Sequence, residues 1–227
     1  YTTFEDNRAG DHGGAIDWLS SAGIFEYINF RANTAEYGGG IYLNGVSSNS
    51  RLNSVYFIEN RATKNGGAID CNASMMGLNN TIFISNYAGE YGAALCREAN
   101  ATGGFGGNNS FIKNHAEIAG AALAWLGVDG ININNYKFIN NTADLSGGAI
   151  YVRGDSPNCK VRNSYFENNR VNDVQDGQGG AIDWLGENGY IYNSTFKDSF
   201  ANTGGTLFIT SNNMNITLSN FTGSRAL

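Results

Sequence analysis

Hydrophobic and polar positions alternate in two short patterns that recur along the whole chain. The first is Phe-x-x-Asn, usually followed by x-Ala, and its phenylalanines return at intervals of about 27 residues. A fixed period of this length is typical of a repeat protein in which one unit stacks on the next. The phenylalanines are Phe4, Phe30, Phe57, Phe83, Phe111, Phe138, Phe166, Phe196 and Phe221, and the polar partners are Asn7, Asn33, Asn60, Asn86, Asn114, Asn141 and Asn169, followed by Ser199 and Ser224.

The second pattern is Gly-Gly-Ala-Ile, which alternates strictly with the first. Each phenylalanine precedes the next glycine by eight or nine residues in seven of the eight repeats, and by 13 between Phe166 and Gly179. The strictly spaced half predicts a rigid path, and the variable half that follows the isoleucine predicts loops on one side. The pattern is complete at 13–16, 66–69, 147–150 and 179–182, with variants at 38–41, 92–95, 120–123 and 204–207.

Three segments of each repeat alternate with the period of two that is typical of a strand. One follows the glycines, one carries the phenylalanine, and one has an apolar centre five residues before it. A unit of this kind buries its apolar face only by stacking on equivalent units. We therefore predict an all-β fold for 1–227 as a single domain: a right-handed parallel β-helix of about eight coils of ~27 residues, with three strands per coil. The apolar centres are Phe25, Leu52, Leu78, Ile133, Val161, Ile191 and Ile216.

The regular residues have structural interpretations. Phenylalanine fills the core, asparagine bonds backbone groups and its equivalents at a corner, and the glycine pair marks a sharp corner. Two positions depart from the pattern. Arg97 falls in an otherwise apolar inward column and is expected at an edge or bulge. The segment Gly103–Gly107 stands where the second strand of one coil should lie, and we expect that strand to be weakened. That inward column reads Trp18, Leu43, Cys71, Arg97, Trp125, Val152, Trp184 and Ile209.

Composition narrows the function classes. Only 15% of residues are charged, the net charge is −6, and clustered Lys and Arg are missing, which argues against a nucleic-acid surface. The sequence contains no run of 18 apolar residues, so we predict no membrane span in it. It also lacks the basic segment followed by an apolar segment that is typical of a signal peptide. The three cysteines, Cys71, Cys96 and Cys159, are too scattered for a disulfide framework or a zinc site and are expected as isolated thiols. The abrupt start at Tyr1 suggests a piece of a longer protein.

The alternation of Gly-Gly-Ala-Ile with Phe-x-x-Asn resembles the repeats of chlamydial polymorphic outer-membrane proteins. The high asparagine content of the repeats, as in residues 138–152, is also similar to that of the adhesin-like proteins of methanogenic archaea. The resemblance covers the whole chain and implies a modular, exported, extracellular protein that displays a β-helical stalk at the cell surface. It implies contact with other cells or surfaces and specifies no ligand.

Candidate chemistry falls on the position directly after each Ile or Leu, which is expected to face outward. Asp17 and Asp70 would lie two coils apart, at about 9.6 Å, a separation close to that of the carboxylates of an inverting glycosidase. One hypothesis is therefore a polysaccharide-active enzyme with Asp17 and Asp70 as its catalytic residues and Asp183 as a further candidate. The alternative without catalysis is an exposed acidic column that keeps the rod soluble.

The same column also predicts a carbohydrate-binding platform, because aromatic faces stack on sugars and carboxylates accept hydroxyl hydrogen bonds. Tyr37 and Tyr91, each in a Glu-Tyr-Gly sequence just before the glycine corner, would extend this platform. The alternative is a row of exposed residues that favour strands. The predicted binding residues are Asp17, Tyr42, Asp70, Tyr151 and Asp183.

Weaker candidates complete the inspection. Asp173 and Asp176 in the long insert could ligate a metal, but a solvated turn is the favoured interpretation, and no cofactor motif is present. His12 and His115 stand alone in different coils and are interpreted as surface or corner residues. Among the Asn-x-Ser/Thr sequons, Asn72 and Asn100 are the better glycosylation candidates.

The sequence therefore favours a non-enzymatic, adhesin-like module that contacts a glycan or protein of another cell. The polysaccharide-active enzyme and a passive stalk remain as alternatives. Because an open β-helix end exposes unpaired backbone groups, we also expect neighbouring coils or end-to-end self-association.

Overall fold

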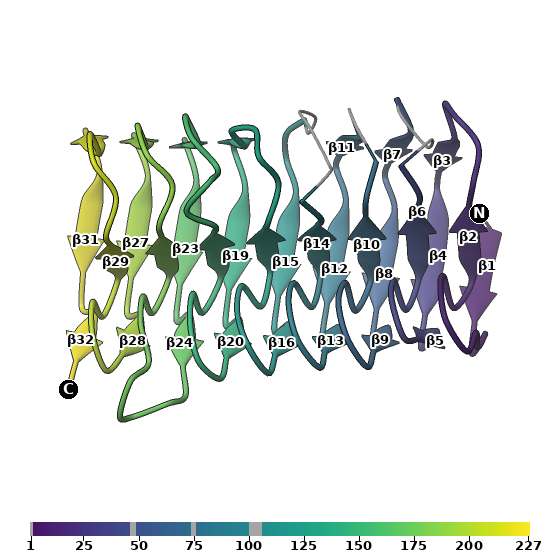
Figure 1. Cartoon of the computed structure of the whole chain (residues 1–227), viewed down its shortest axis with the longest axis horizontal. Coiled ribbons are helices and arrows are strands. Elements are labelled where there is room, and N and C mark those ends of the chain that lie inside the picture. The colour runs from purple at the N-terminus through teal and green to yellow at the C-terminus, as the bar shows by residue number, and fades with distance from the viewer. Residues whose placement is uncertain (1, 46–48, 74–75, 100–105) are drawn as a thin grey trace.

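The computed structural model describes residues 2–45, 49–73, 76–99 and 106–227. Successive repeats lie side by side as the coils of a rod, with the two termini at opposite ends (Figure 1). Strand pairing is parallel and joins each strand to its equivalent in the neighbouring coil. The chain is therefore a parallel β-helix of about eight turns, as the repeat predicts.

The strands that carry the phenylalanines form one nine-stranded sheet, the Phe sheet. Consecutive phenylalanines are register partners, and their ring centroids lie 4.4–5.1 Å apart with interplanar angles of 1–13°. The predicted phenylalanine column is confirmed. Its strands are β1 (Thr2–Glu5), β4 (Ile28–Arg31), β8 (Tyr56–Ile58), β12 (Ile82–Ile84), β15 (Ser110–Ile112), β19 (Lys137–Ile139), β23 (Tyr165–Glu167), β27 (Thr195–Lys197) and β31 (Asn220–Thr222).

The strands that follow the glycine pairs form an eight-stranded sheet, the Gly sheet. The first glycine of each pair has a positive φ of 56–65°. At Gly147 a Cβ would lie 2.3 Å from the carbonyl oxygen of Ile150, so the turn requires glycine. The strands are β2 (Ile16–Trp18), β6 (Ile41–Leu43), β10 (Ile69–Cys71), β14 (Leu95–Arg97), β17 (Leu123–Trp125), β21 (Ile150–Val152), β25 (Ile182–Trp184) and β29 (Leu207–Ile209).

The second strands with their apolar centres form two separate sheets. The break falls at the coil that contains Gly103–Gly107, where the glycine run predicts a weakened strand. Gly107 makes a single parallel bridge with Asn134, and residues 103–105 lie outside the described residues. One sheet contains β3 (Ile24–Glu26), β7 (Arg51–Asn53) and β11 (Gly77–Asn79), and the other contains β18 (Asn132–Asn134), β22 (Lys160–Arg162), β26 (Tyr190–Tyr192) and β30 (Asn215–Thr217).

The structure adds a fourth strand to the three predicted in each coil. It spans two residues between the asparagine corner and the glycine corner, which is too short for a periodicity to reveal. It buries the alanine or valine of the Phe-x-x-Asn-x-Ala pattern along most of the rod. These strands are β5 (Thr34–Ala35), β9 (Arg61–Ala62), β13 (Tyr87–Ala88), β16 (His115–Ala116), β20 (Thr142–Ala143), β24 (Arg170–Val171), β28 (Phe200–Ala201) and β32 (Arg225–Ala226).

Asparagines at the corner after each Phe-sheet strand form a continuous buried ladder. The Oδ1 atom of Asn114 accepts hydrogen bonds from the backbone N–H and the Nδ2 of Asn86, each at 3.0 Å. The Nδ2 of Asn114 in turn donates to the carbonyl oxygen of Phe83. Each asparagine thus replaces the backbone partners lost where the chain leaves a strand, which confirms the predicted role. At Ser199 the shorter side chain ends the ladder, and only its backbone N–H bonds the next coil, through Ser224 Oγ.

Arg97 corrects a prediction. It occupies a regular position in β14, in register with Cys71 and Trp125, and is fully buried rather than at an edge or bulge. Its Nη1 donates to Cys71 Sγ at 3.0 Å, and the guanidinium lies 5.2 Å from the Trp125 ring. The guanidinium of Arg97 is thus accommodated in an otherwise apolar column by a hydrogen bond to the Cys71 thiol and a cation–π contact with the Trp125 indole.

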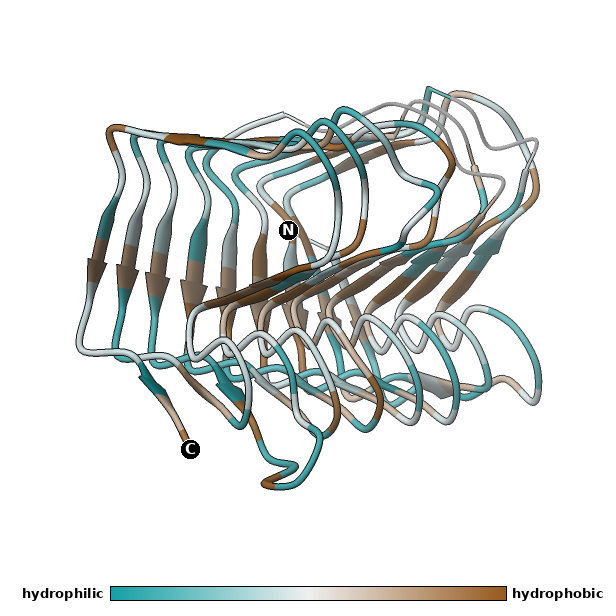
Figure 2. Cartoon of the chain, turned by 60° about the vertical axis from the view of Figure 1, so that its left-hand side comes forward, coloured by the Kyte–Doolittle hydropathy of each residue, from teal (hydrophilic) through white to brown (hydrophobic). Residues whose placement is uncertain are grey.

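Hydrophobic positions recur at equivalent places in successive coils (Figure 2). The long insert after β24 projects from the rod beyond the neighbouring corners (Figure 1). In the described part of the chain, we find no helix with the length and hydrophobicity that crossing a bilayer requires.

The ladder generates a stability prediction. Asn114→Ala removes one side chain and leaves the Asn86 amides and the Phe83 carbonyl without their partners inside the rod. We expect a loss of about 3 kcal/mol in the free energy of unfolding, measured by urea denaturation. Asn132→Ala, at an exposed position in β18, is the control and should change stability by less than about 0.5 kcal/mol. Equal effects of the two substitutions would contradict a structural ladder.

Candidate functional site

Two columns of side chains run along the rod beside the Gly sheet. The outward column takes the central residue of each Gly-sheet strand, and strand register places its members in line as predicted. The pre-glycine column takes the residue before the positive-φ glycine of each corner, and parallel bridges join most of its members. The outward column is Asp17, Tyr42, Asp70, Cys96, Ala124, Tyr151, Asp183 and Phe208, and the pre-glycine column is His12, Tyr37, Asn65, Tyr91, Ala119, Ser146, Gln178 and Thr203.

The two columns contact each other because the glycine corner turns the chain back toward the sheet. The ring centroids of His12 and Tyr42 lie 4.1 Å apart, and those of Tyr91 and Tyr151 lie 6.0 Å apart. Ser146 Oγ donates a hydrogen bond to Asp183. Where the columns meet around Tyr42 and Asp70, the outward side chains therefore line a groove rather than an open surface.

This arrangement corrects the prediction of an exposed acidic column. Asp17 is exposed, but Asp70 is 0% and Asp183 is 2% exposed. The prediction is wrong for these two residues because neighbours in both columns cover them. Burial raises the pKa of Asp183 to about 6, although the bond from Ser146 opposes this shift.

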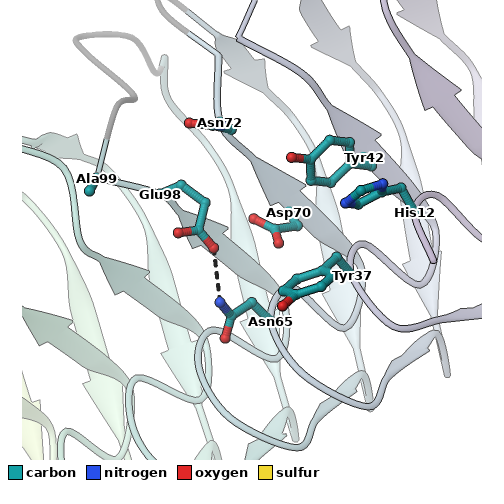
Figure 3. A pocket seen from close by; sticks show the side chains of 8 residues that line it. All are labelled: His12, Tyr37, Tyr42, Asn65, Asp70, Asn72, Glu98 and Ala99. Carbon is teal, nitrogen blue, oxygen red and sulfur yellow. Dashed lines mark hydrogen bonds between the residues drawn. The ribbon is translucent and has the colours of Figure 1, made fainter.

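A hollow of about 370 Å³ opens between the columns near the N-terminal end of the rod. Aromatic side chains lie at one end of it and acidic and amide side chains at the other (Figure 3). Some of the residues that line this hollow were predicted as binding residues, and others were not. The lining residues are His12, Tyr37, Tyr42, Asn65, Asp70, Asn72, Glu98 and Ala99.

The aromatic end contains three rings in contact. The His12 ring lies between Tyr42 at 4.1 Å and Tyr37 at 5.5 Å, measured between ring centroids. Contrary to the prediction, His12 therefore does not stand alone. Lys64 Nζ donates to the Tyr37 hydroxyl at 3.0 Å and pairs with Glu36 at 2.7 Å, which holds Tyr37 in place. Burial, and then the nearby Asp70, raise the pKa of Tyr42.

The acidic end brings together Asp70, Cys96 and Glu98. Within the described residues, neither carboxyl oxygen of Asp70 has a hydrogen-bond partner, and both are buried. Burial, and then the nearby Glu98 carboxylate, raise the pKa of Asp70 well above its usual range. Cys96 Sγ lies 3.8 Å from Glu98 Oε1, which also accepts a bond from Asn65 Nδ2 at 2.9 Å.

The candidate catalytic residues do not share one centre. Tyr42 separates Asp17 from Asp70 in the register, and three strands lie between Asp70 and Asp183. At the spacing of β-strands, Asp70 and Asp183 are about 19 Å apart along the rod. The predicted binding residues divide accordingly into two groups, one around Tyr42 and one around Tyr151. Tyr37 lies near the first group and Tyr91 contacts the second.

The remaining candidates lie away from the groove or at its margin. Asp173 Oδ1 accepts bonds from the backbone N–H groups of Gln175 and Asp176, which closes a turn. Asn72 is half-buried in the hollow, and Asn100 lies outside the described residues. His115 lies 3.5 Å from Asp144 and stacks beside Tyr87 at a distant corner.

Sequence reasoning missed Glu98 and, apart from Tyr37 and Tyr91, the pre-glycine column as parts of the site. A signal for Glu98 was present, since it stands two residues after Cys96 and a strand places such residues on one face. The pre-glycine column gave no comparable signal, because its approach to the Gly sheet depends on the angle of the glycine corner.

Comparisons with known proteins identify a related repeat. Residues 1–17, 54–72 and 135–153 match the model of the Chlamydia polymorphic membrane protein repeat. The chain is thus a β-helix repeat protein similar to that family in these three segments. The comparisons with curated proteins and with solved structures found no match.

Asp183 generates a prediction for the pH dependence of stability. Its pKa of about 6 exceeds the ~3.9 of an unfolded aspartate, so the folded state binds more protons between these values. Stability contributed by this group should therefore fall as the pH rises from about 4 to 6 and stay low above it. Asp183→Asn, whose Oδ1 can still accept from Ser146, should stabilise the protein by ~3 kcal/mol at pH 7.5 and have little effect at pH 3.5.

Thermal unfolding at both pH values measures this effect. Asp17→Asn, at the exposed position of the same column, is the control. A stabilisation by Asp183→Asn that does not change with pH would contradict the assignment.

Proposed function

We propose that this chain is a surface-exposed, adhesin-like β-helix module that contacts other cells or surfaces through a carbohydrate-binding groove. The similarity to the Chlamydia polymorphic membrane protein repeat supports a surface location and an adhesin-like role. The β-helix supports a display role, because a stacked rod presents the same column position in every coil.

The observation that carries the binding proposal is the aromatic end of the hollow beside its amide and acidic end. His12, Tyr37 and Tyr42 offer ring faces for stacking on the apolar face of a sugar. Asn65 and Asn72 on the opposite side supply amide groups, and carboxylates accept hydrogen bonds from hydroxyls. This combination suits a polyhydroxylated ligand better than an apolar one.

Charge favours neutral glycans over acidic ones. Asp70 and Glu98 lie in the hollow, and the chain has a formal net charge of −6. A second aromatic pair, Tyr91 and Tyr151, lies farther along the same two columns, beside the buried Asp183. An extended neutral oligosaccharide that lies along the rod would contact both groups.

The polysaccharide-active enzyme is the weaker candidate. Asp17, Asp70 and Asp183 are spread along the column, and Asp70 and Asp183 are too deeply buried to approach a glycosidic oxygen. The passive stalk remains the other candidate. Binding and turnover experiments distinguish all three.

Glycan binding tests the proposal. The full chain, applied to an array of neutral and acidic oligosaccharides, should retain neutral glycans preferentially. Tyr42→Ala removes the central ring and should weaken this binding roughly tenfold, in line with the loss of an aromatic stacking contact. Tyr56→Ala is the matched control, since Tyr56 is an exposed tyrosine of the Phe sheet, away from the groove.

Three outcomes would contradict the proposal. Failure to retain any oligosaccharide would favour the passive stalk. Equal binding by the Tyr42 and Tyr56 variants would place recognition outside the hollow. Release of shorter glycans by the wild type, together with its loss in Asp70→Asn, would establish the enzyme.

A further inference from the structure

The acidic end of the hollow contains a set of side chains that suits a metal ion. Among the residues that the structure describes, Asp70, Cys96 and Glu98 form the one group of three potential ligands whose donor atoms all lie within 4.8 Å of one another. Asp70 and Cys96 are fully buried, and Glu98 is half-buried. The group combines one sulfur and two carboxylates.

The repeat architecture places these residues together. Asp70 in β10 and Cys96 in β14 are register partners, so their side chains leave the Gly sheet on the same face. Glu98 follows Cys96 by two residues, and its backbone N–H bonds the carbonyl oxygen of Cys71 at 2.9 Å. Pairing with the previous coil therefore continues past the end of β14 and keeps Glu98 beside the other two.

Asp70 supplies an independent sign that a ligand is missing from this group. Its side chain is 0% exposed and points into the hollow (Figure 3), and neither of its oxygens has a hydrogen-bond partner among the described residues. A buried polar group without a partner is uncommon in native proteins. The closest charged group is the Glu98 carboxylate, which repels an ionised Asp70.

We propose that Asp70, Cys96 and Glu98 bind a divalent transition-metal ion of the zinc class. A divalent cation would neutralise the two carboxylates and give the Asp70 oxygens their missing partner. Three protein ligands leave one coordination position in a tetrahedral site, and the ligands Asp70 and Glu98 line the hollow. Water or a ligand hydroxyl could occupy that position.

The donor atoms select the metal. A thiolate is a poor ligand for Mg²⁺ and Ca²⁺, which prefer oxygen, whereas Zn²⁺ accepts sulfur and carboxylate oxygen together. Zinc bonds of about 2.0–2.3 Å in a tetrahedral site separate ligand atoms by roughly 3.5 Å. The half-buried Glu98 side chain can close the remaining gap by rotation.

Residues around the group would orient its ligands. Asn65 Nδ2 donates to Glu98 Oε1 at 2.9 Å, and the backbone N–H of Tyr91 donates to Asn65 Oδ1 at 3.2 Å. The first bond directs the Glu98 carboxylate and the second fixes Asn65. Such outer contacts commonly support metal ligands, which makes Asn65 a positioning residue.

The inference is independent of glycan binding, and metal titration tests it without a sugar. After treatment with a chelator, the full chain should bind one equivalent of Zn²⁺ by calorimetry. Co²⁺ should give a thiolate-to-cobalt charge-transfer absorption, which reports directly on Cys96. Cys96→Ala should abolish this absorption and weaken Zn²⁺ binding more than about 100-fold, and Asn65→Ala should weaken it by about tenfold.

Two further variants complete the experiment. Cys159→Ala removes another buried thiol, far from the hollow, and should leave both signals unchanged. Glu98→Gln changes a half-buried ligand and keeps the proposal testable if Cys96→Ala does not fold. Absence of Zn²⁺ binding by the wild type would overturn the proposal, as would an unchanged cobalt spectrum in Cys96→Ala, or Ca²⁺ binding as tight as that of Zn²⁺.

Discussion

Parallel pairing of each coil with the next is the constraint on which the whole structure depends. It forces equivalent residues to lie over one another, so each position of the repeat becomes a column along the rod. The Asn114 ladder and the Phe111 stack maintain this alignment on the two sides of one corner. A slip of one residue would turn the phenylalanines outward and separate the asparagines, so the register is strongly specified.

Because parallel pairing aligns equivalent residues, charged side chains of the same sign would repel one another if they occupied one column. The surface shows how such repulsion is avoided. On the Phe sheet, Arg31 lies between Glu5 and Glu59 and contacts both, at 3.5 and 3.7 Å. In the outward column, Tyr42 separates Asp17 from Asp70. Asp70 departs from this rule because Glu98 of the next coil reaches it, and that departure is the basis of the metal proposal.

Several departures from the repeat lie close together around Arg97. Arg97 enters the core between Cys71 and Trp125, while Cys96 and Glu98 on either side of it face the hollow. A few residues farther along the chain, the second-strand sheet is interrupted. Local exceptions to a consistent pattern are where function is expected, because elsewhere the pattern alone accounts for the residues.

The architecture follows from the sequence, because phenylalanine, asparagine and glycine that recur about every 27 residues are all accounted for by a parallel β-helix. The outward column and its order are predictable as well, since both follow from register. Which of these side chains are buried depends on the folded coils. The glycine corner brings His12, Asn65 and Ser146 over the column, so Asp70 and Asp183 are enclosed while Asp17 remains in solvent. The angle of that corner depends on backbone conformation and packing between coils, which spacing along a chain does not encode in a readable form.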